Sequence, residues 1–285
     1  MTAGEGAASE TGARARAFLE SLGALPDERI DIAEAALAFA RIDLPLEDPE
    51  LARRHLRALA EEAARLTSGE AEESARSLGE LLALRHGYRG DSETYDDPAN
   101  ANLLRVIARR RGLPVALGIL WLHAAKAAGI EAWGIDFPGH FLVGVAGARV
   151  QARTGGAAVA VDVFDGGAVR TRDELAALLA RFAGPAVMLG PEHLRAMSTR
   201  EVLLRLQNNL RLRRAAAGDL EGALVAAEDM LRLAPAAGPL WREAAVLAER
   251  LGRPRAALAA WERAAALTGA DEAAAALARL RRQLH

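Results

Sequence analysis

The stretch DPANANLLRVIARRRGLPVALGILWLHAAKAAGIEAWGIDFPGHFLVGV, from Asp97 to Val145, decides the fold of this 285-residue chain. Its first part has a helical period and predicts a helix over 100–111, which Gly112-Leu113-Pro114 interrupts. A second helix is predicted over 115–128, because a proline precedes it and Gly129 follows it. Apolar residues cover nearly all of its faces, including the i, i+3, i+4 and i+7 positions Leu117, Leu120, Trp121 and Ala124. We therefore predict that this helix is central and buried.

After this helix the pattern changes to that of strands. Two short strands are predicted over 130–137 and 141–146, on either side of the turn Pro138-Gly139-His140. A third is predicted over 157–164, before the turn Asp165-Gly166-Gly167, and 150–156 is expected to be a strand edge and loop. Thr171 and Glu174 then form the pattern of a capping box, which begins a helix that runs to Phe182.

The region before the central stretch reads as helical. Over 13–95 we predict helices at 14–22, 26–40, 49–66 and 70–84. Residues 1–12 are small and polar, and they are expected to form a disordered tail rather than a signal peptide. The segment 184–197 is expected to be a linker.

The C-terminal region, 198–285, contains an internal repeat. Four pairs of residues lie 34 positions apart, namely Gly218 and Gly252, Ala223 and Ala257, Ala227 and Trp261, and Met230 and Ala264. A 34-residue period of helix pairs is typical of tetratricopeptide repeats. Two repeats are too few to stand alone. We therefore expect them to pack against the central domain, extended by a last helix over 271–284.

Composition excludes several classes of function. The net charge is −2, so no overall attraction to nucleic acid or to anionic lipid is expected. The chain has no cysteine, which excludes disulfides, thiolate metal sites and thiol catalysis. No run of 18 apolar residues occurs, so no membrane-spanning helix is expected and a cytoplasmic location is predicted.

Several motifs in order give the chain a resemblance to a known family. They are Asp97-Pro98-x-Asn100, Val106-x-x-Arg109-Arg110-x-Gly112-x-Pro114-x-x-Leu117, Pro138-Gly139-His140-Phe141-Leu142 and Val161-Asp162-x-Phe164-x-Gly166-Gly167. Over roughly 27–267 the chain resembles the SirB-type proteins. The resemblance implies an α+β, mostly helical fold. It would have a helical N-terminal region, a transglutaminase-like (cysteine-protease-like) core over 96–183 and C-terminal tetratricopeptide-like repeats.

The resemblance also implies where a catalytic site would lie. Transglutaminase-like enzymes place a cysteine at the start of a buried helix, a histidine on a facing strand and an aspartate on the next strand. His140 and Asp162 match the last two positions, while Pro114 occupies the place of the nucleophile. Proline supplies neither a nucleophile nor a backbone N–H for an oxyanion hole. The nearest serine or threonine residues in sequence are Thr94 and Thr154.

Two interpretations of these residues stay open. His140 and Asp162 either keep a ligand pocket, together with Asn100, Gly112, Pro114 and Gly139, or they only fix a turn. Asn100 is expected to cap the helix that begins near Leu103. Arg109-Arg110-Arg111 is expected to be a solvated cationic helix end rather than an anion site. No spacing indicates a metal site, and no cofactor is expected.

The sequence leads to two hypotheses of function. The first is a non-enzymatic interaction or scaffold protein, built on a degenerate transglutaminase-like domain, that binds a protein partner through its C-terminal repeats. The second is a hydrolase or acyl-transfer enzyme that uses His140 and Asp162 to activate water. The missing nucleophile favours the first hypothesis.

Overall fold

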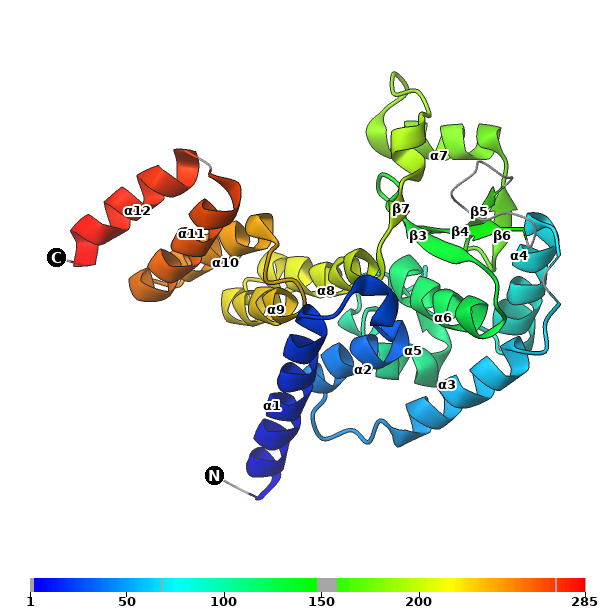
Figure 1. Cartoon of the computed structure of the whole chain (residues 1–285), viewed down its shortest axis with the longest axis horizontal. Helices are drawn as coiled ribbons and strands as arrows, with labels where there is room; N and C mark the ends of the chain where they lie inside the picture. Colours follow the sequence, from blue (N-terminus) through cyan, green and yellow to red (C-terminus); the bar gives the residue numbers. More distant parts are fainter. Residues whose placement is uncertain (1–2, 68, 148–157, 270, 285) are drawn as a thin grey trace. The chain divides into compact units, whose positions relative to one another are not determined.

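The computed structural model describes residues 3–67, 69–147, 158–269 and 271–284 (Figure 1). The chain divides into two compact units. Asp27–Leu203 forms a mixed unit of helices and strands, and Met1–Pro26 together with Leu204–His285 forms a helical unit. The strand edge and loop predicted over 150–156 lie outside the described residues.

The mixed unit is mostly helical with a small sheet, as the sequence predicted. Its helices are η1 Asp27–Arg29, α2 Ile32–Asp43, α3 Glu50–Ala63, α4 Ala71–Gly79, η2 Glu80–Arg85, η3 Pro98–Asn100, α5 Leu103–Arg109, α6 Pro114–Ala127, α7 Arg172–Ala183 and η4 Pro191–Leu194. Its strands are β1 Arg89–Gly90, β2 Arg111–Gly112, β3 Ala132–Ile135, β4 Leu142–Ala146, β5 Ala158–Asp162, β6 Ala168–Arg170 and β7 Ala196–Met197.

The main sheet is antiparallel and has the strand order β6-β5-β4-β3-β7. Its centre is a hairpin in which Ile135 pairs with Leu142, and Val143 pairs in turn with Val161 of β5. The segment 184–197, predicted to be a linker, supplies the edge strand β7, whose Met197 pairs with Gly134. Sequence pattern missed β7 because a two-residue strand has no measurable period.

Helix α6 is buried over most of its length, from Pro114 to Trp121 and again at Ala124 and Ala125, which confirms the prediction for this segment. It packs against α2, α3 and α5 and against strands β3 and β4 (Figure 1). Leu117, Leu120 and Trp121 are each 2% exposed or less. The opposite face of the sheet is covered by α7, whose Leu175 and Leu179 pack with Ile135 and Leu142.

Two glycines let α6 lie close to the sheet. A Cβ on Gly118 of α6 would lie 2.2 Å from the Phe141 ring, and one on Gly134 of β3 would lie 3.0 Å from the same ring. Phe141 itself is 2% exposed. This aromatic side chain therefore fills the interface between helix and sheet, and it can do so only because both neighbours lack a side chain.

The helical unit contains both ends of the chain. Its helices are α1 Ala3–Gly23, most of α8 Thr199–Ala216, α9 Leu220–Leu233, α10 Gly238–Arg250, α11 Pro254–Thr268 and α12 Asp271–Leu284. The sequence predicted a disordered tail over 1–12, whereas α1 begins at Ala3. Helix α1 packs on α9, and its Arg16 pairs with the buried Asp229 at 2.8 Å. Such a contact across 213 positions leaves no local signal in the sequence.

Residues 34 positions apart in the helical unit have similar surroundings. Ala223 and Ala257 are both fully buried, and Ala227 and Trp261 are at most 3% exposed. Gly218 and Gly252 both have positive φ, at the ends of α8 and α10. The predicted breaks between helices are therefore present, and so is the last helix, α12.

None of the described helices is both long enough and apolar enough to traverse a bilayer.

We predict that Leu120→Ala destabilises the mixed unit by about 2–5 kcal/mol, because it leaves a cavity in an enclosed helix. Chemical denaturation, followed by circular dichroism, measures this change. Leu84→Ala serves as the control, since Leu84 is 81% exposed and its truncation is expected to cost less than about 0.5 kcal/mol. Equal effects of the two substitutions would contradict the burial of α6.

We predict that Ala257→Leu destabilises the helical unit by about 1–3 kcal/mol, because the added atoms overpack a fully buried position. Its neighbour on α11, Ala256, is exposed, so Ala256→Leu adds the same atoms where there is space. The melting temperatures of the two variants are compared. Both substitutions change helix propensity equally, so a difference between them reports on packing at position 257. If Ala257→Leu were as stable as Ala256→Leu, the close helix packing at this position would be refuted.

Candidate functional site

The start of α6 is the first component of the candidate site. Leu113 precedes the helix in extended conformation, and Pro114 is its first residue. The Leu113 N–H donates to the Asn100 carbonyl at 2.9 Å. A Cβ on Gly112 would lie 2.8 Å from Val106, so the close approach of these segments requires glycine there. The helix therefore begins with a residue that offers no N–H to a ligand.

Asn100 lies directly beside this helix start but has a different role from the one predicted. It is fully buried, and its side-chain Nδ2 donates to the Thr94 carbonyl at 2.6 Å. Its Oδ1 is buried without a hydrogen-bond partner among the described residues. The prediction that Asn100 caps α5 is wrong, because Asn102 Oδ1 accepts the N–H groups of Leu104 and Arg105.

Asp91 forms a second polar centre near this helix start. It is 1% exposed and accepts hydrogen bonds from the Thr94 N–H at 2.9 Å and from Arg109 at 2.8 Å. The hydrogen bond from the Thr94 backbone lowers the pKa of Asp91, and it outweighs the opposing effect of burial. Arg109 also pairs with Asp97 at 3.2 Å. Asp91 is therefore ionised, and its hydrogen bonds hold the loop before α5 in place.

The predicted solvated cationic helix end at 109–111 is wrong. Each of its arginines has a partner, since Arg111 pairs with Glu93 at 2.9 Å and Arg110 lies 4.8 Å over the Tyr88 ring. Arg110 also donates to His55 Nε2 at 2.6 Å. Burial, together with the charge of Arg110, lowers the pKa of His55 to about 4, so this imidazole is neutral and accepts the hydrogen bond.

His140 is positioned by the turn between β3 and β4. Its N–H donates to the Phe137 carbonyl at 2.9 Å, and the preceding Gly139 has φ of 69°. A Cβ on Gly139 would lie 2.4 Å from the Phe182 ring, so glycine is needed for space as well as for conformation. His140 Nε2 lies 3.0 Å from Asp162 Oδ1. The contact predicted between the two residues is present.

Asp162 has more partners than the sequence indicated. Its Oδ1 also accepts the N–H groups of Phe164 at 3.2 Å and Asp165 at 3.3 Å. Its Oδ2 accepts from Arg170 Nη2 at 2.9 Å. Because a carboxylate only accepts hydrogen bonds, His140 donates through Nε2. Both oxygens of this 5% exposed carboxylate are therefore occupied.

These partners stabilise the ionised form of Asp162. Burial alone would raise the pKa of Asp162, but the hydrogen bond from His140, with the Arg170 guanidinium, outweighs it and holds the pKa below its ordinary value. Asp162 is thus a carboxylate at neutral pH. It orients the His140 ring and at the same time joins β5 to β6 through Arg170.

Phe164 connects the histidine to the helix start. The His140 and Phe164 rings meet edge to face, with centroids 6.3 Å apart. The Phe164 carbonyl accepts the Gly90 N–H at 3.1 Å, and Gly90 pairs with Gly112 immediately before α6. The fold therefore brings together the helix start and the two strand ends in the order that the resemblance implies.

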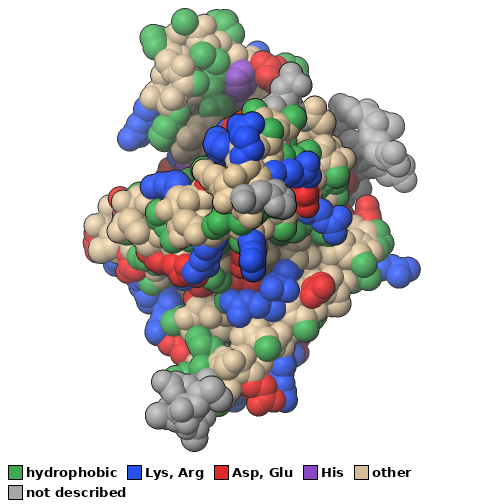
Figure 2. Space-filling view, turned by 90° about the vertical axis from the view of Figure 1, so that its left-hand side faces the viewer, with side chains coloured by type: hydrophobic (Ala, Val, Ile, Leu, Met, Phe, Trp, Pro, Cys, Tyr) green, Lys and Arg blue, Asp and Glu red, His purple; other side chains and the backbone are tan. Residues whose placement is uncertain are grey.

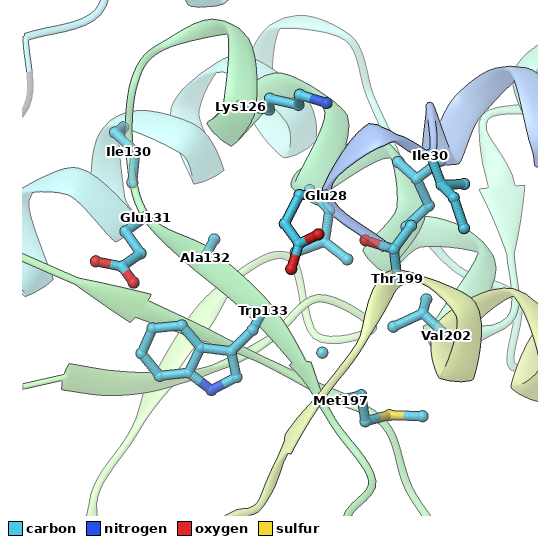
Figure 3. Close-up of a pocket in the computed structure, with 13 residues that line it drawn as sticks. Glu28, Ile30, Lys126, Ile130, Glu131, Ala132, Trp133, Met197, Thr199 and Val202 are labelled. Atoms are coloured by element: carbon cyan, nitrogen blue, oxygen red, sulfur yellow. The ribbon is translucent and has the colours of Figure 1, made fainter. Parts of the chain in front are cut away.

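A separate cavity of about 280 Å³ opens beside β3 (Figure 3). Apolar side chains such as Ile30 and Val202 lie around it, and Glu28 and Lys126 are among its charged lining residues (Figure 3). Neither His140 nor Asp162 is among its lining residues.

The sequence pattern did not indicate Asp91, His55, Tyr88 or Arg170. For Asp91 a signal existed, because an aspartate three residues before Thr94 is typical of a side chain that closes a turn. His55 and Tyr88 act through contacts between residues far apart in the sequence, and the contacts of Arg170 with Asp162 and Asp165 depend on the register of β5 and β6. Within the described ranges, no group of three or more His, Cys, Asp or Glu side chains is arranged to hold a metal ion.

The chain is similar to several known proteins. A family model described as transglutaminase-like superfamily matches residues 50–208. The crystal structure of menin is similar with a TM-score of 0.39 and 12% identity, over 87% of this chain and 69% of menin. A UPF0162 protein of Xylella fastidiosa is 28% identical over 75% of this chain and 76% of its own. A UPF0162 protein of Pseudomonas aeruginosa is 31% identical, over 87% of this chain and 88% of its own. The chain therefore belongs to the transglutaminase-like superfamily, together with the UPF0162 proteins.

Proposed function

We propose that this protein is a non-enzymatic, cytoplasmic interaction protein of the SirB type. Its degenerate transglutaminase-like domain is a scaffold, and its C-terminal helices are tetratricopeptide-like repeats that bind a protein partner. The observation that carries the proposal is Pro114 at the start of α6, in a chain without cysteine.

Pro114 removes two contributions to acyl transfer at once. The position can supply no thiolate or hydroxyl, so no covalent intermediate forms there. It also supplies no backbone N–H to a developing oxyanion, and one such donor contributes about 3 to 4 kcal/mol to known reactions of this kind. Leu113 N–H is already donated to Asn100, so it offers no replacement.

The contacts of Asp162 support a structural role for the pair with His140. An aspartate whose task is only to orient a histidine needs one oxygen for it. Here the second oxygen binds Arg170, which also contacts Asp165 at 2.6 Å across the turn between β5 and β6. These contacts favour a role of the pair in holding strands β4, β5 and β6 together.

Features of the helical unit support the proposal that this protein binds a protein partner. The equivalent burial of Ala223 and Ala257, and the positive φ of Gly218 and Gly252, agree with two repeats of 34 residues. Basic and acidic side chains are interspersed on the face displayed in Figure 2. A mixed surface of this kind favours a protein partner over nucleic acid or anionic lipid.

The hydrolase hypothesis has one observation in its favour. The hydrogen bond from His140 to Asp162 is the one that orients a general base, and such a base can activate water directly. That mechanism lacks a nucleophile and an N–H at the helix start, so we rank it second.

We predict that the purified protein has no turnover of amide, ester or thioester substrates above the uncatalysed rate, because no group can form the covalent intermediate. Release of a chromophoric leaving group measures this. The variants His140→Ala and His193→Ala are assayed beside the wild type. Turnover that disappears with His140→Ala and persists with His193→Ala would refute the interaction proposal and establish the hydrolase.

We predict that Asp162→Asn destabilises the mixed unit at neutral pH by about 2–4 kcal/mol, because it removes the charge that His140 and Arg170 share. The folded-state pKa of Asp162 is lowered, so its stabilising contribution is complete above the unfolded value of about 4. It is lost as the pH falls through the folded-state value.

The measurement is urea denaturation of wild type and variant between pH 7 and pH 3. The difference in free energy of unfolding should shrink below about pH 4. Asp173→Asn is the control, because Asp173 is exposed in the first turn of α7 and contributes less than about 1 kcal/mol. A difference that stays constant down to pH 3 would show that Asp162 does not act through its charge.

A further inference from the structure

The helical unit contains a groove of about 630 Å³ between the end of α1 and helices α9 and α10. Its walls are formed by Glu20, Gly23 and Ala24 of the first segment, Glu228, Leu231, Arg232 and Pro235 of the second, and Trp241 of α10. This volume lies within the range of about 300–1,000 Å³ that is usual for ligand sites.

The groove has rigid walls. At its base α1 approaches α9 so closely that a Cβ on Gly23 would lie 2.5 Å from the Arg232 carbonyl. Pro235 follows the end of α9 and cannot continue it. The Trp241 indole N–H donates to the Pro235 carbonyl at 2.9 Å, which fixes the ring as one wall. Packing and hydrogen bonds therefore preorganise the aromatic surface.

Most charges at the groove are already paired. Arg232 contacts Asp229 at 3.3 Å and Glu20 at 3.6 Å, and Asp229 also binds Arg16. Glu228 differs, because this exposed carboxylate has no hydrogen bond or ion pair with any residue that the structure describes. The groove thus presents one carboxylate without a hydrogen bond and one tryptophan.

The electrostatic environment of Glu228 also favours the binding of a cation. Although the side chain is exposed, the protein around its carboxyl group partly shields that group from water and raises the pKa of Glu228 above its ordinary value. The neighbouring Asp229 adds to the rise, and the charges of Arg232 and Arg253 oppose it. A carboxylate whose folded-state pKa is raised costs stability at neutral pH, where it is ionised. Glu228 therefore does not stabilise the unit in its free form, and a cation that entered the groove would relieve this cost.

We propose that the groove binds an arginine side chain presented by a segment of a partner protein. The guanidinium pairs with Glu228, and the rest of the side chain lies along Leu231 and the Trp241 ring. Guanidinium groups stack on tryptophan and bind carboxylates through two parallel hydrogen bonds, which suits this combination. The inference rests on the proposed function and names the chemistry of the partner.

The test uses the full-length protein and capped five-residue alanine peptides whose central residue is arginine, glutamine or glutamate. Each peptide is titrated to about 10 mM, so that dissociation constants in the millimolar range are seen. The probe is the nuclear magnetic resonance signal of the Trp241 indole N–H, assigned by its loss in Trp241→Phe. We expect the arginine peptide to shift this signal, and the glutamine and glutamate peptides to leave it unchanged.

The variant Glu228→Gln should bind the arginine peptide about tenfold more weakly, because one charge-assisted contact is lost. The melting temperature of this variant should not fall below that of the wild type, which would show that the weaker binding does not result from unfolding. Glu61→Gln in α3 makes the same change of charge at an exposed position and should leave binding unaltered. Equal binding of arginine and glutamine peptides, no shift at all, or unchanged affinity in Glu228→Gln would each overturn the proposal.

These outcomes are independent of the proposed function itself. If the arginine peptide does not bind and the catalytic assays are also negative, the groove assignment fails while the interaction proposal stands. If the assays show turnover that depends on His140, the interaction proposal fails, whatever the peptides do.

Discussion

The fold depends on one constraint, which is that α6 is apolar over most of its surface and must be covered by the rest of the unit. Helices α2, α3 and α5 cover it together with strands β3 and β4. Gly118 and Gly134 let the Phe141 ring close the contact with the sheet. Because Phe141 follows His140 directly, the packing of this ring also determines where the turn between β3 and β4 lies.

The same core also positions the polar residues of the candidate site. The start of α6, which is Pro114, and the pair His140 and Asp162 are held by packing and hydrogen bonds within the unit. Arg109 binds Asp91 and Arg170 binds Asp162, while Asn100 Oδ1 has no hydrogen-bond partner among the described residues. The two charge pairs thus help to hold the segments around the site in place.

The sequence predicted much of this molecule where the signals were local. The capping box at Thr171 and the enclosed α6 are examples, since period and capping act over a few residues. The exchange of roles between Asn100 and Asn102 could not be predicted, because two asparagines two positions apart are equally good caps. The resemblance, rather than any period, paired His140 with Asp162. Arg170 was missed because its contacts depend on the strand register.

The union of both chain ends in one unit has a consequence for synthesis. Arg16 is synthesised 213 residues before its partner Asp229. At a synthesis rate of about 5 to 20 residues per second, the delay is about 10 to 40 s. During that time Leu19, which is buried in the finished protein, cannot pack against helix α9 because α9 has not yet been synthesised. Chaperones therefore have a long interval in which to bind α1.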